Sequence, residues 1–174
     1  MHASAVICGT ARVTSEPFET IVRRREAQVL RTAFRILGNW ADAEDVAQET
    51  FLRLHRHGTG FRDEAALGSW LYRVTVNLCF DRTRAAKPSA EMPELLAQGI
   101  SAESSVIREQ AKEKLMAALG MLPARERAAV VLREIEGLST AEVAEVLGSS
   151  EVTVRSQISR AMARLRGMLQ REEV

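Results

Sequence analysis

Residues 139–160 read Ser-Thr-Ala-Glu-Val-Ala-Glu-Val-Leu-Gly-Ser-Ser-Glu-Val-Thr-Val-Arg-Ser-Gln-Ile-Ser-Arg. The stretch opens with Ser139 and has Glu142 three residues later, which is the pattern of a capping box at a helix N-terminus. A short helix should follow, in which the small residue Ala144 lets a second helix approach closely, and Gly148 ends it with a tight turn. The two serines after the glycine can cap the next helix. This order predicts a helix-turn-helix, whose second helix enters the DNA major groove.

The second helix of this motif has a polar and basic face. Its expected exposed residues are Thr153, Arg155, Ser156, Gln157, Ser159 and Arg160. An arginine can pair bidentately with guanine, and a glutamine with adenine. Further along the helix, phosphates could be held by Arg164, Arg166 and Arg171. A helical hairpin with a solvated basic face is the plain alternative, but the cap, the small residue, the glycine turn and the basic helix together favour DNA binding.

Helical periodicity extends over nearly the whole chain. Apolar residues recur every three or four positions in several stretches, as in Leu67, Leu71, Val74 and Leu78. No strand-like alternation bounded by turns occurs, so we expect an all-α fold. Residues 88–105 have weak periodicity and only acidic charges. We therefore expect two small helical domains joined by a flexible acidic linker, with an N-terminal tail at 1–15, the domains at 16–86 and 106–174 and the linker at 87–105.

The composition is that of an ordinary globular protein. The 174 residues include 24 Lys and Arg against 23 Asp and Glu, so the formal net charge is +1. This balance excludes a uniformly basic nucleic-acid binder, although basic and acidic stretches alternate along the chain. No apolar run approaches the roughly 20 residues that span a bilayer, and the N-terminus lacks the pattern of a secretory signal. Because Cys8 and Cys79 cannot make a disulfide framework, we expect a reduced, cytoplasmic protein without membrane insertion.

Acidic residues mark the start of the second expected helix. Three acids fall in its first turn, namely Asp42, Glu44 and Asp45. Carboxylates there complement the helix dipole, and that role alone would explain them. Glu49 lies beyond the useful range of the dipole. Together with Gln48, Leu52 and Arg53 it would form a mixed polar and apolar surface that suits a protein partner.

A loop with two glycines, residues 58–64, precedes the third expected helix, which we place from Ser69 to Arg84. One face of this helix carries residues four, four and three apart, namely Arg73, Asn77, Asp81 and Arg84. Trp70 lies beside the apolar stripe, so we expect it in the core. Tyr72 is less tied to the stripe and could meet a base or a backbone.

With these motifs the chain resembles a bacterial RNA polymerase sigma factor of the small extracytoplasmic-function (ECF, group IV) type. In the first domain the resemblance rests on residues 42–54 (DAEDVAQETFLRL), on Phe61-Arg62 and on residues 70–74 (WLYRV) with Asn77 and Asp81. In the second domain it rests on residues 122–127 (LPARER), 132–139 (LREIEGLS) and 154–156 (VRS), with Arg160-Ala161 and Leu165-Arg166. Order and spacing match the family over nearly the whole chain.

The resemblance implies a division of labour among the helices. The second helix would bind the coiled coil of the polymerase β′ clamp through Asp42, Asp45, Gln48, Glu49, Leu52 and Arg53. The loop and the third helix would recognise and melt the −10 promoter element through Phe61, Arg62, Asp63, Tyr72, Arg73, Asn77 and Arg84. The helix-turn-helix would read the −35 element through Thr153, Arg155, Ser156, Gln157, Ser159, Arg160 and Arg164. The apolar side of the second domain would contact the β flap.

The resemblance also implies the partners of the protein. They would be core RNA polymerase, promoter DNA and an anti-sigma factor that holds the protein inactive. We expect a specificity subunit and not an enzyme, with no catalytic residue, cofactor, bound metal or small-molecule substrate. Two residues depart from the family pattern. His55 stands where tryptophan is common, and Gln157 stands where a basic residue is common.

Two other functions would account for part of the sequence. A stand-alone helix-turn-helix repressor would share the second domain and bind its operator unaided, but it leaves the first domain unexplained. A metal-dependent hydrolase would draw its ligands from Asp42, Glu44, Asp45, Glu49, His55 and His57. Against it, the usual Glu-x-x-His pair is absent, and histidines two residues apart diverge on a helix. We therefore interpret the chain as an alternative sigma factor that binds core RNA polymerase, directs it to specific promoters and helps to melt the DNA.

Overall fold

The computed structural model describes residues 16–85 and 104–171 of the chain. Within these two ranges every regular element is a helix and no strand occurs, which confirms the expected all-α class. In chain order the elements are α1 (Phe18–Leu37), α2 (Trp40–His57), α3 (Glu64–Ala85), α4 (Ser104–Gly120), α5 (Ala124–Val130), the π-helical turn η1 (Val131–Ile135), α6 (Thr140–Leu147) and α7 (Glu151–Arg171). We call residues 16–85 the first half and residues 104–171 the second half. The expected tail and nearly all of the expected linker lie outside the described residues.

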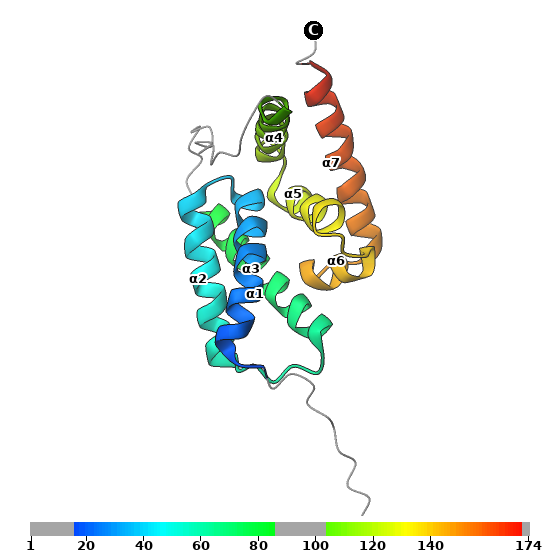
Figure 1. Cartoon of the computed structure of the whole chain (residues 1–174). Helices are drawn as coiled ribbons and strands as arrows, with labels where there is room; N and C mark the ends of the chain where they lie inside the picture. Colours follow the sequence, from blue (N-terminus) through cyan, green and yellow to red (C-terminus); the bar gives the residue numbers. More distant parts are fainter. Residues whose placement is uncertain (1–15, 86–103, 172–174) are drawn as a thin grey trace, which may run out of the picture.

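The first half is a bundle of α1, α2 and α3 (Figure 1). Side-chain caps start the second and third helices. The Oδ1 of Asn39 accepts a hydrogen bond from the backbone N–H of Asp42 at 2.9 Å, and the Oδ1 of Asp63 accepts one from the N–H of Ala66 at 2.8 Å. Because an N-cap fixes where a helix begins, α2 and α3 both start earlier in the chain than the apolar periodicity indicates.

The second half contains the predicted helix-turn-helix, formed by α6 and α7. The Oγ of Ser139 accepts a hydrogen bond from the N–H of Glu142 at 3.2 Å, and the Oε2 of Glu142 accepts one from the N–H of Ser139 at 2.7 Å, which confirms the capping box. Gly148 ends α6 with φ 57°, a left-handed conformation that glycine adopts without strain. The Oγ of Ser150 then accepts from the N–H of Thr153 at 3.1 Å and caps α7.

Removal of the α6 cap should weaken the second half. We expect Ser139→Ala to lower the free energy of unfolding by about 1 kcal/mol, because the first turn of α6 loses its acceptor. Urea unfolding followed by circular dichroism measures the change. Ser149→Ala is the matched control, since the Ser149 side chain makes no hydrogen bond with the described residues. Equal losses in the two variants would contradict the role of the cap.

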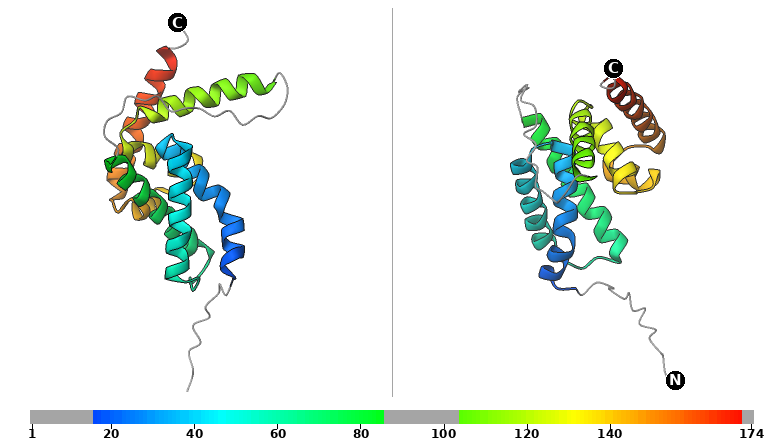
Figure 2. Two further views of the ribbon diagram at one scale, coloured as in Figure 1. Left: turned by 90° about the vertical axis from the view of Figure 1, so that its left-hand side faces the viewer. Right: turned by 45° about the horizontal axis from the view of Figure 1, so that its top comes forward.

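The two halves pack against each other, as the two further views in Figure 2 also show. α3 lies beside α6, while α1 contacts α4, α5 and η1. One apolar cluster spans both halves, with Ile36, Val76 and Cys79 buried from the first and Leu119 and Leu132 buried from the second. A second cluster lies within the first half alone. The sequence left the relative placement of the halves open, and the shared cluster shows that they are docked.

Candidate nucleic-acid and partner interfaces

The outer face of α7 presents most of the residues that the sequence assigned to the −35 element. Exposed on it are Thr153, Arg155, Ser156, Ser159, Arg160 and Arg164. The guanidinium of Arg155 pairs with the carboxylate of Glu151 at 2.7 Å, and both side chains are exposed. The hydroxyl of Thr153 lies 2.8 Å from that of Ser150. α7 therefore offers a row of donors on the side that a major groove would meet.

Gln157 does not lie on this face, and the expectation that it does is wrong. Its side chain is buried, with 7% of the residue exposed. It comes three residues after Val154 and four before Ala161, both fully buried, so it falls on the inward stripe of α7. Its Oε1 has no hydrogen-bond partner among the described residues. The Gln157 side chain therefore packs within the second half and is not presented on the outer face of α7.

A buried carboxylate lies behind two basic residues of α7. Glu126 of α5 is buried, although acids rarely are unless they are paired. Its Oε1 is 3.7 Å from the Nε of Arg160, and its Oε2 is 3.5 Å from the Nε of Arg164. Both guanidinium groups stay largely exposed on their outer sides. The charge of Glu126 therefore helps to hold this part of the basic face in position. Local sequence gives no signal for this role.

The loop between α2 and α3 is held by an aromatic cluster. Phe61, expected at the −10 surface, is buried instead: its ring stacks on His57 at 5.2 Å between centroids and contacts Trp70 at 5.7 Å. Trp70 packs against the apolar cluster of the first half, as expected. Arg62 is exposed and pairs with Asp63 at 2.9 Å. The Phe61 side chain therefore anchors the loop and does not face solvent, because burial of an aromatic ring is strongly favourable.

Asp63 caps α3, so its contribution should depend on pH. The hydrogen bond from the N–H of Ala66, helped by Arg62, lowers the pKa of the Asp63 carboxyl. A lowered pKa in the folded state means that the cap stabilises the fold above the ordinary carboxyl pKa and is lost as pH falls through the lowered value. We expect the NMR shift of the Ala66 amide to titrate in acid, and the titration to vanish in Asp63→Asn. A flat wild-type curve would contradict this role.

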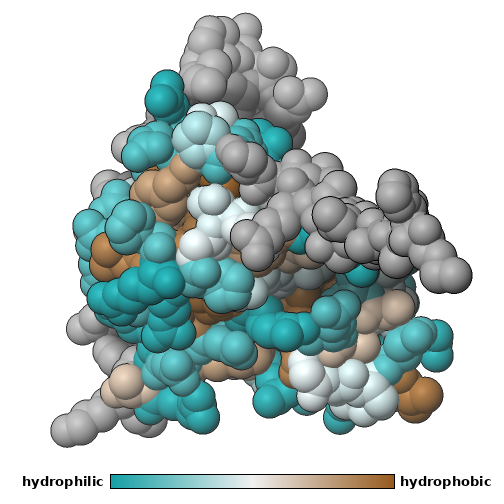
Figure 3. Space-filling model, turned by 90° about the horizontal axis from the view of Figure 1, so that it is seen from below, coloured by the Kyte–Doolittle hydropathy of each residue, from teal (hydrophilic) through white to brown (hydrophobic). Residues whose placement is uncertain are grey.

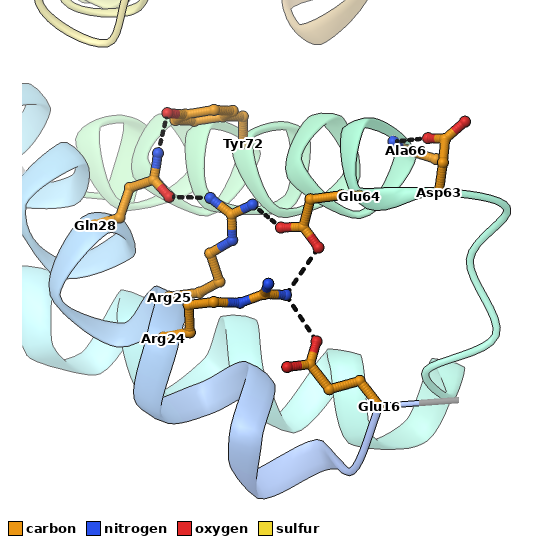
Figure 4. A network of polar contacts seen from close by, with 8 residues as sticks. All are labelled: Glu16, Arg24, Arg25, Gln28, Asp63, Glu64, Ala66 and Tyr72. Atoms are coloured by element: carbon orange, nitrogen blue, oxygen red, sulfur yellow. Dashed lines mark hydrogen bonds and ion pairs between the residues drawn. The ribbon is translucent and has the colours of Figure 1, made fainter. Parts of the chain in front are cut away.

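Tyr72 belongs to a chain of polar contacts between α1 and α3, shown in Figure 4. The Nε2 of Gln28 donates to the hydroxyl of Tyr72, and the Oε1 of Gln28 accepts from Arg25 at 2.7 Å. Arg25 in turn pairs with Glu64, the first residue of α3. The chain continues to Arg24 and Glu16. Tyr72 is thus connected, through α1, to the end of the loop that precedes α3.

The remaining −10 candidates on α3 are exposed, as expected. Asn77 is exposed, and Arg84 is exposed beside Asp81, with which it pairs. Arg73 is exposed too, but its guanidinium reaches the second half and pairs with Glu145 of α6 at 3.0 Å. The structure therefore brings Arg73 against the second half and leaves Asn77 and Arg84 open.

A hollow of about 530 Å³ lies where α2 and α3 meet α5, and its lining includes Arg53, Asn77, Arg84 and Arg125. The sequence assigned Arg53 to the polymerase surface, yet here it faces two −10 candidates, while its Nε pairs with Glu49 at 2.9 Å. The guanidinium of Arg125 lies over the ring of Phe80, 5.5 Å from the centroid. The sequence analysis did not single out Arg125, because Arg125 comes to line this hollow only when the second half docks on the first.

The acidic face of α2 forms an open groove with α3. The groove has a volume of about 450 Å³, and its lining includes Asp45, Gln48, Glu49 and Leu52. Leu52 is exposed there. The groove also contains Arg82, which the sequence did not single out and which pairs with Asp42 at 2.6 Å and Asp45 at 2.7 Å. Apart from Arg53, the residues assigned to the polymerase thus gather in one place.

The structure gives no support to a membrane span or a metal site in the parts it describes. Within residues 16–85 and 104–171, no helix is both long and apolar enough to cross a bilayer. The same ranges hold no group of three or more His, Cys, Asp or Glu residues that could bind a metal ion.

His55 packs edge-on against Phe18, 5.1 Å between ring centroids. On the face seen from below in Figure 3, hydrophilic residues predominate and apolar ones are scattered among them.

Comparison with known proteins decides the family. Residues 21–88 match the model of Sigma-70 region 2, and residues 112–165 match that of Sigma-70, region 4. The ECF RNA polymerase sigma factor SigM of Mycobacterium tuberculosis is 37% identical over 152 residues, which cover 87% of this chain and 76% of the relative. The chain belongs to the ECF RNA polymerase sigma factors.

Two further comparisons agree with this assignment. The ECF RNA polymerase sigma factor SigW of Bacillus subtilis is 30% identical over 167 residues, which cover 88% of this sigma factor and 89% of the relative. The fold matches that of the sigma factor RpoE from Bartonella quintana with a TM-score of 0.71, over 88% of this chain and 96% of that one, at 22% identity. The protein is an alternative sigma factor, which binds core RNA polymerase and directs it to promoters, as the sequence predicted.

Proposed function

We propose that the two halves of this sigma factor read different promoter elements, and that α7 reads the −35 element in the major groove. The supporting observation is the exposed row Arg155, Ser156, Ser159 and Arg160 on the second helix of a helix-turn-helix. Residues near the start of such a helix reach base edges, and residues further along meet phosphates. Thr153 therefore belongs with the base-reading residues and Arg164 with the phosphate contacts. Gln157 is left out because it is buried.

The first half would hold the melted −10 strand on α3 and the loop before it. The side chains that we assign to the single strand are Arg62, Tyr72, Arg73, Asn77 and Arg84, although Tyr72 and Arg73 already have partners within the protein. Phe61 and Asp63 would act indirectly: Phe61 anchors the loop and Asp63 caps α3, so neither needs to contact the strand. Separation of a DNA duplex costs about 1.4 kcal/mol per base step. Captured bases and polymerase contacts must offset that cost. Captured bases can do so in part, because stacking of a base on a side chain contributes about 1–3 kcal/mol.

The groove between α2 and α3 would bind the β′ clamp of the polymerase. It combines the carboxylates of Asp45 and Glu49, the amide of Gln48 and the exposed side chain of Leu52. Asp42 would act through its ion pair with Arg82. The β flap would cover the exposed apolar residues of the second half, which include Leu115, Met121, Met162 and Leu169.

Run-off transcription by reconstituted holoenzyme tests the −10 assignment. We expect Tyr72→Ala and Asn77→Ala each to lower the initial rate of transcript formation by about tenfold, the equivalent of one lost stacking or polar contact to the strand. Arg23→Ala, an exposed change on α1, is the control and should have no effect. Binding to core polymerase should be equal in all three. Wild-type rates from both α3 variants would refute the assignment.

A stand-alone repressor is the rival function for the second half. Such a protein binds duplex DNA tightly without polymerase, whereas a sigma factor binds promoter DNA poorly alone.

The solved relative from Bartonella quintana is in complex with an anti-sigma factor. We include an inhibitor of this kind among the partners of this chain. Because polymerase and promoter DNA share the bacterial cytoplasm, we place the action of the protein there.

A further inference from the structure

Val152, the second residue of α7, is an apolar side chain that stands in solvent. The residue is 69% exposed, whereas Met162 and Leu169, two other apolar residues exposed on α7, are 39% and 38% exposed. The residues assigned above to the −35 element do not include it. A single exposed apolar residue is common on protein surfaces. The position of Val152 on the helix is therefore what matters.

Val152 lies on the side of α7 that points away from the core. On its inner side α7 packs against α4, α5 and α6, and it buries Val154 and Ala161 completely. At 3.6 residues per turn, Val152, Ser156 and Ser159 fall on the opposite side. The Oγ of Ser156 donates to the backbone carbonyl of Val152 at 3.0 Å, one turn back on that side. Val152 therefore begins the line of side chains that reaches furthest into a groove.

The stability of α7 does not account for a valine at this position. β-Branched residues are less favourable in helices than straight-chain residues, because the preceding turn restricts χ1. Val152 gains little from burial in return, since most of the residue is exposed. The same restriction makes the side chain rigid, so that a contact costs little conformational entropy. Such a side chain is well suited to contact a small apolar group.

The major groove of DNA presents one kind of apolar group, the C5-methyl group of thymine. Recognition helices contact base edges with their N-terminal residues, and Val152 lies in the first turn of α7, which Ser150 caps. A valine side chain has no acceptor for the amino group of cytosine, and it would separate that group from water. Thymine is therefore the base whose edge a valine favours.

Arg155 lies on the same side of α7, three residues after Val152. Three residues advance a helix by about 4.5 Å along its axis, and neighbouring base pairs are about 3.4 Å apart. The two side chains are thus spaced for base pairs that are adjacent or one apart. A guanidinium group that binds guanine and a valine that contacts a methyl group would together read a short sequence.

We propose that Val152 is a specificity-determining residue, and that it contacts the methyl group of a thymine in the −35 element within two base pairs of the one that Arg155 reads. The inference rests on the proposed role of α7 in the major groove of the −35 element. It adds an apolar contact to the polar row on this helix, and it predicts a preference for thymine at one position.

Deoxyuridine tests the contact because it differs from thymidine only by the missing methyl group. Holoenzyme reconstituted with the full chain first selects its preferred −35 sequence from promoter duplexes randomised over that element. Each thymine of the selected element, on either strand, is then replaced singly by deoxyuridine. Competition binding gives the affinity of holoenzyme for each duplex. The test variant is Val152→Ala, and the matched control is Val22→Ala, which makes the same truncation on α1 in the first half.

We expect one thymine at which deoxyuridine lowers the affinity of the wild-type and Val22→Ala holoenzymes by about fourfold, the effect of one methyl group removed from an apolar contact. In Val152→Ala the same replacement should have almost no effect, because the partner of the methyl group is already gone. The melting temperature of Val152→Ala should not fall, since alanine is the better helix former. Loss of the fold would therefore not explain the result.

Four results would overturn the proposal. The selected element contains no thymine, no deoxyuridine lowers the affinity, the loss is equal in Val152→Ala and the wild type, or the affected thymine lies more than two base pairs from the one that Arg155 reads. Failure of the −35 assignment is distinguishable. In that case Arg155→Ala holoenzyme also keeps the wild-type base preference. If Arg155→Ala relaxes the preference while Val152→Ala keeps the deoxyuridine loss, α7 reads the element and Val152 does not.

Discussion

Reversal of two charges in the groove of α2, in the double variant Asp45→Arg/Glu49→Arg, is expected to abolish stable binding to core RNA polymerase. Both carboxylates line the groove that we assign to the β′ clamp, beside the exposed Leu52. Loss of a central interface contact commonly costs about 2 kcal/mol or more, so we expect at least a thirtyfold loss of affinity.

The fold should tolerate these two substitutions. Asp45 and Glu49 pair with Arg82 and Arg53 in exposed ion pairs, and such pairs contribute between about 0 and 1 kcal/mol to stability. Helical content by circular dichroism should therefore match the wild type. The matched control is Glu19→Arg/Glu26→Arg, which makes the same change of charge at exposed positions of α1. Competition with a second sigma factor for core polymerase gives the affinities. If the groove variant and the control compete equally well, the clamp lies elsewhere.

Arg155→Ala should weaken recognition of the −35 element by about 1–3 kcal/mol and relax the preference for one base pair. Arg155 is exposed on the first turns of α7, where helix-turn-helix proteins contact base edges. Its ion pair with Glu151 is exposed and spaced i,i+4, a kind worth only about 0.3–0.5 kcal/mol, so DNA can displace it. The unpaired guanidinium is then free to bind a guanine with two hydrogen bonds.

A set of promoter duplexes that differ at one −35 position at a time separates the two possible roles. If Arg155 reads a base, Arg155→Ala loses affinity for the preferred sequence and little for the others. Arg166→Ala is the comparison: this exposed residue lies further along α7, where a phosphate contact would lower affinity for every sequence alike and reduce the salt dependence. A uniform loss with Arg155→Ala as well would reassign Arg155 to the phosphate backbone.

Several elements of the structure were predictable from local sequence. The capping box of Ser139 and Glu142, the turn at Gly148 and the burial of Cys79 all follow from short-range rules on hydrogen bonding, backbone freedom and apolar periodicity. The exposed row on α7 follows from the same periodicity. Prediction failed for Gln157 because a polar residue on the inward stripe looks like a recognition residue when only its type is considered. The burial of Phe61 was not predictable either, because a loop position gives no sign that an aromatic cluster will bury it.

The sequence by itself therefore determined the helices, the helix-turn-helix and the family of this sigma factor. These features depend on contacts within a few residues or on motifs in fixed order. Only the tertiary structure decided how the halves meet, that Glu136 is buried against Thr32, Arg35 and Tyr72, and that Arg73 is engaged by α6. These contacts join residues that lie 64 to 104 positions apart. No local pattern encodes them, because their energy comes from the burial of surfaces that the chain brings together only when it folds.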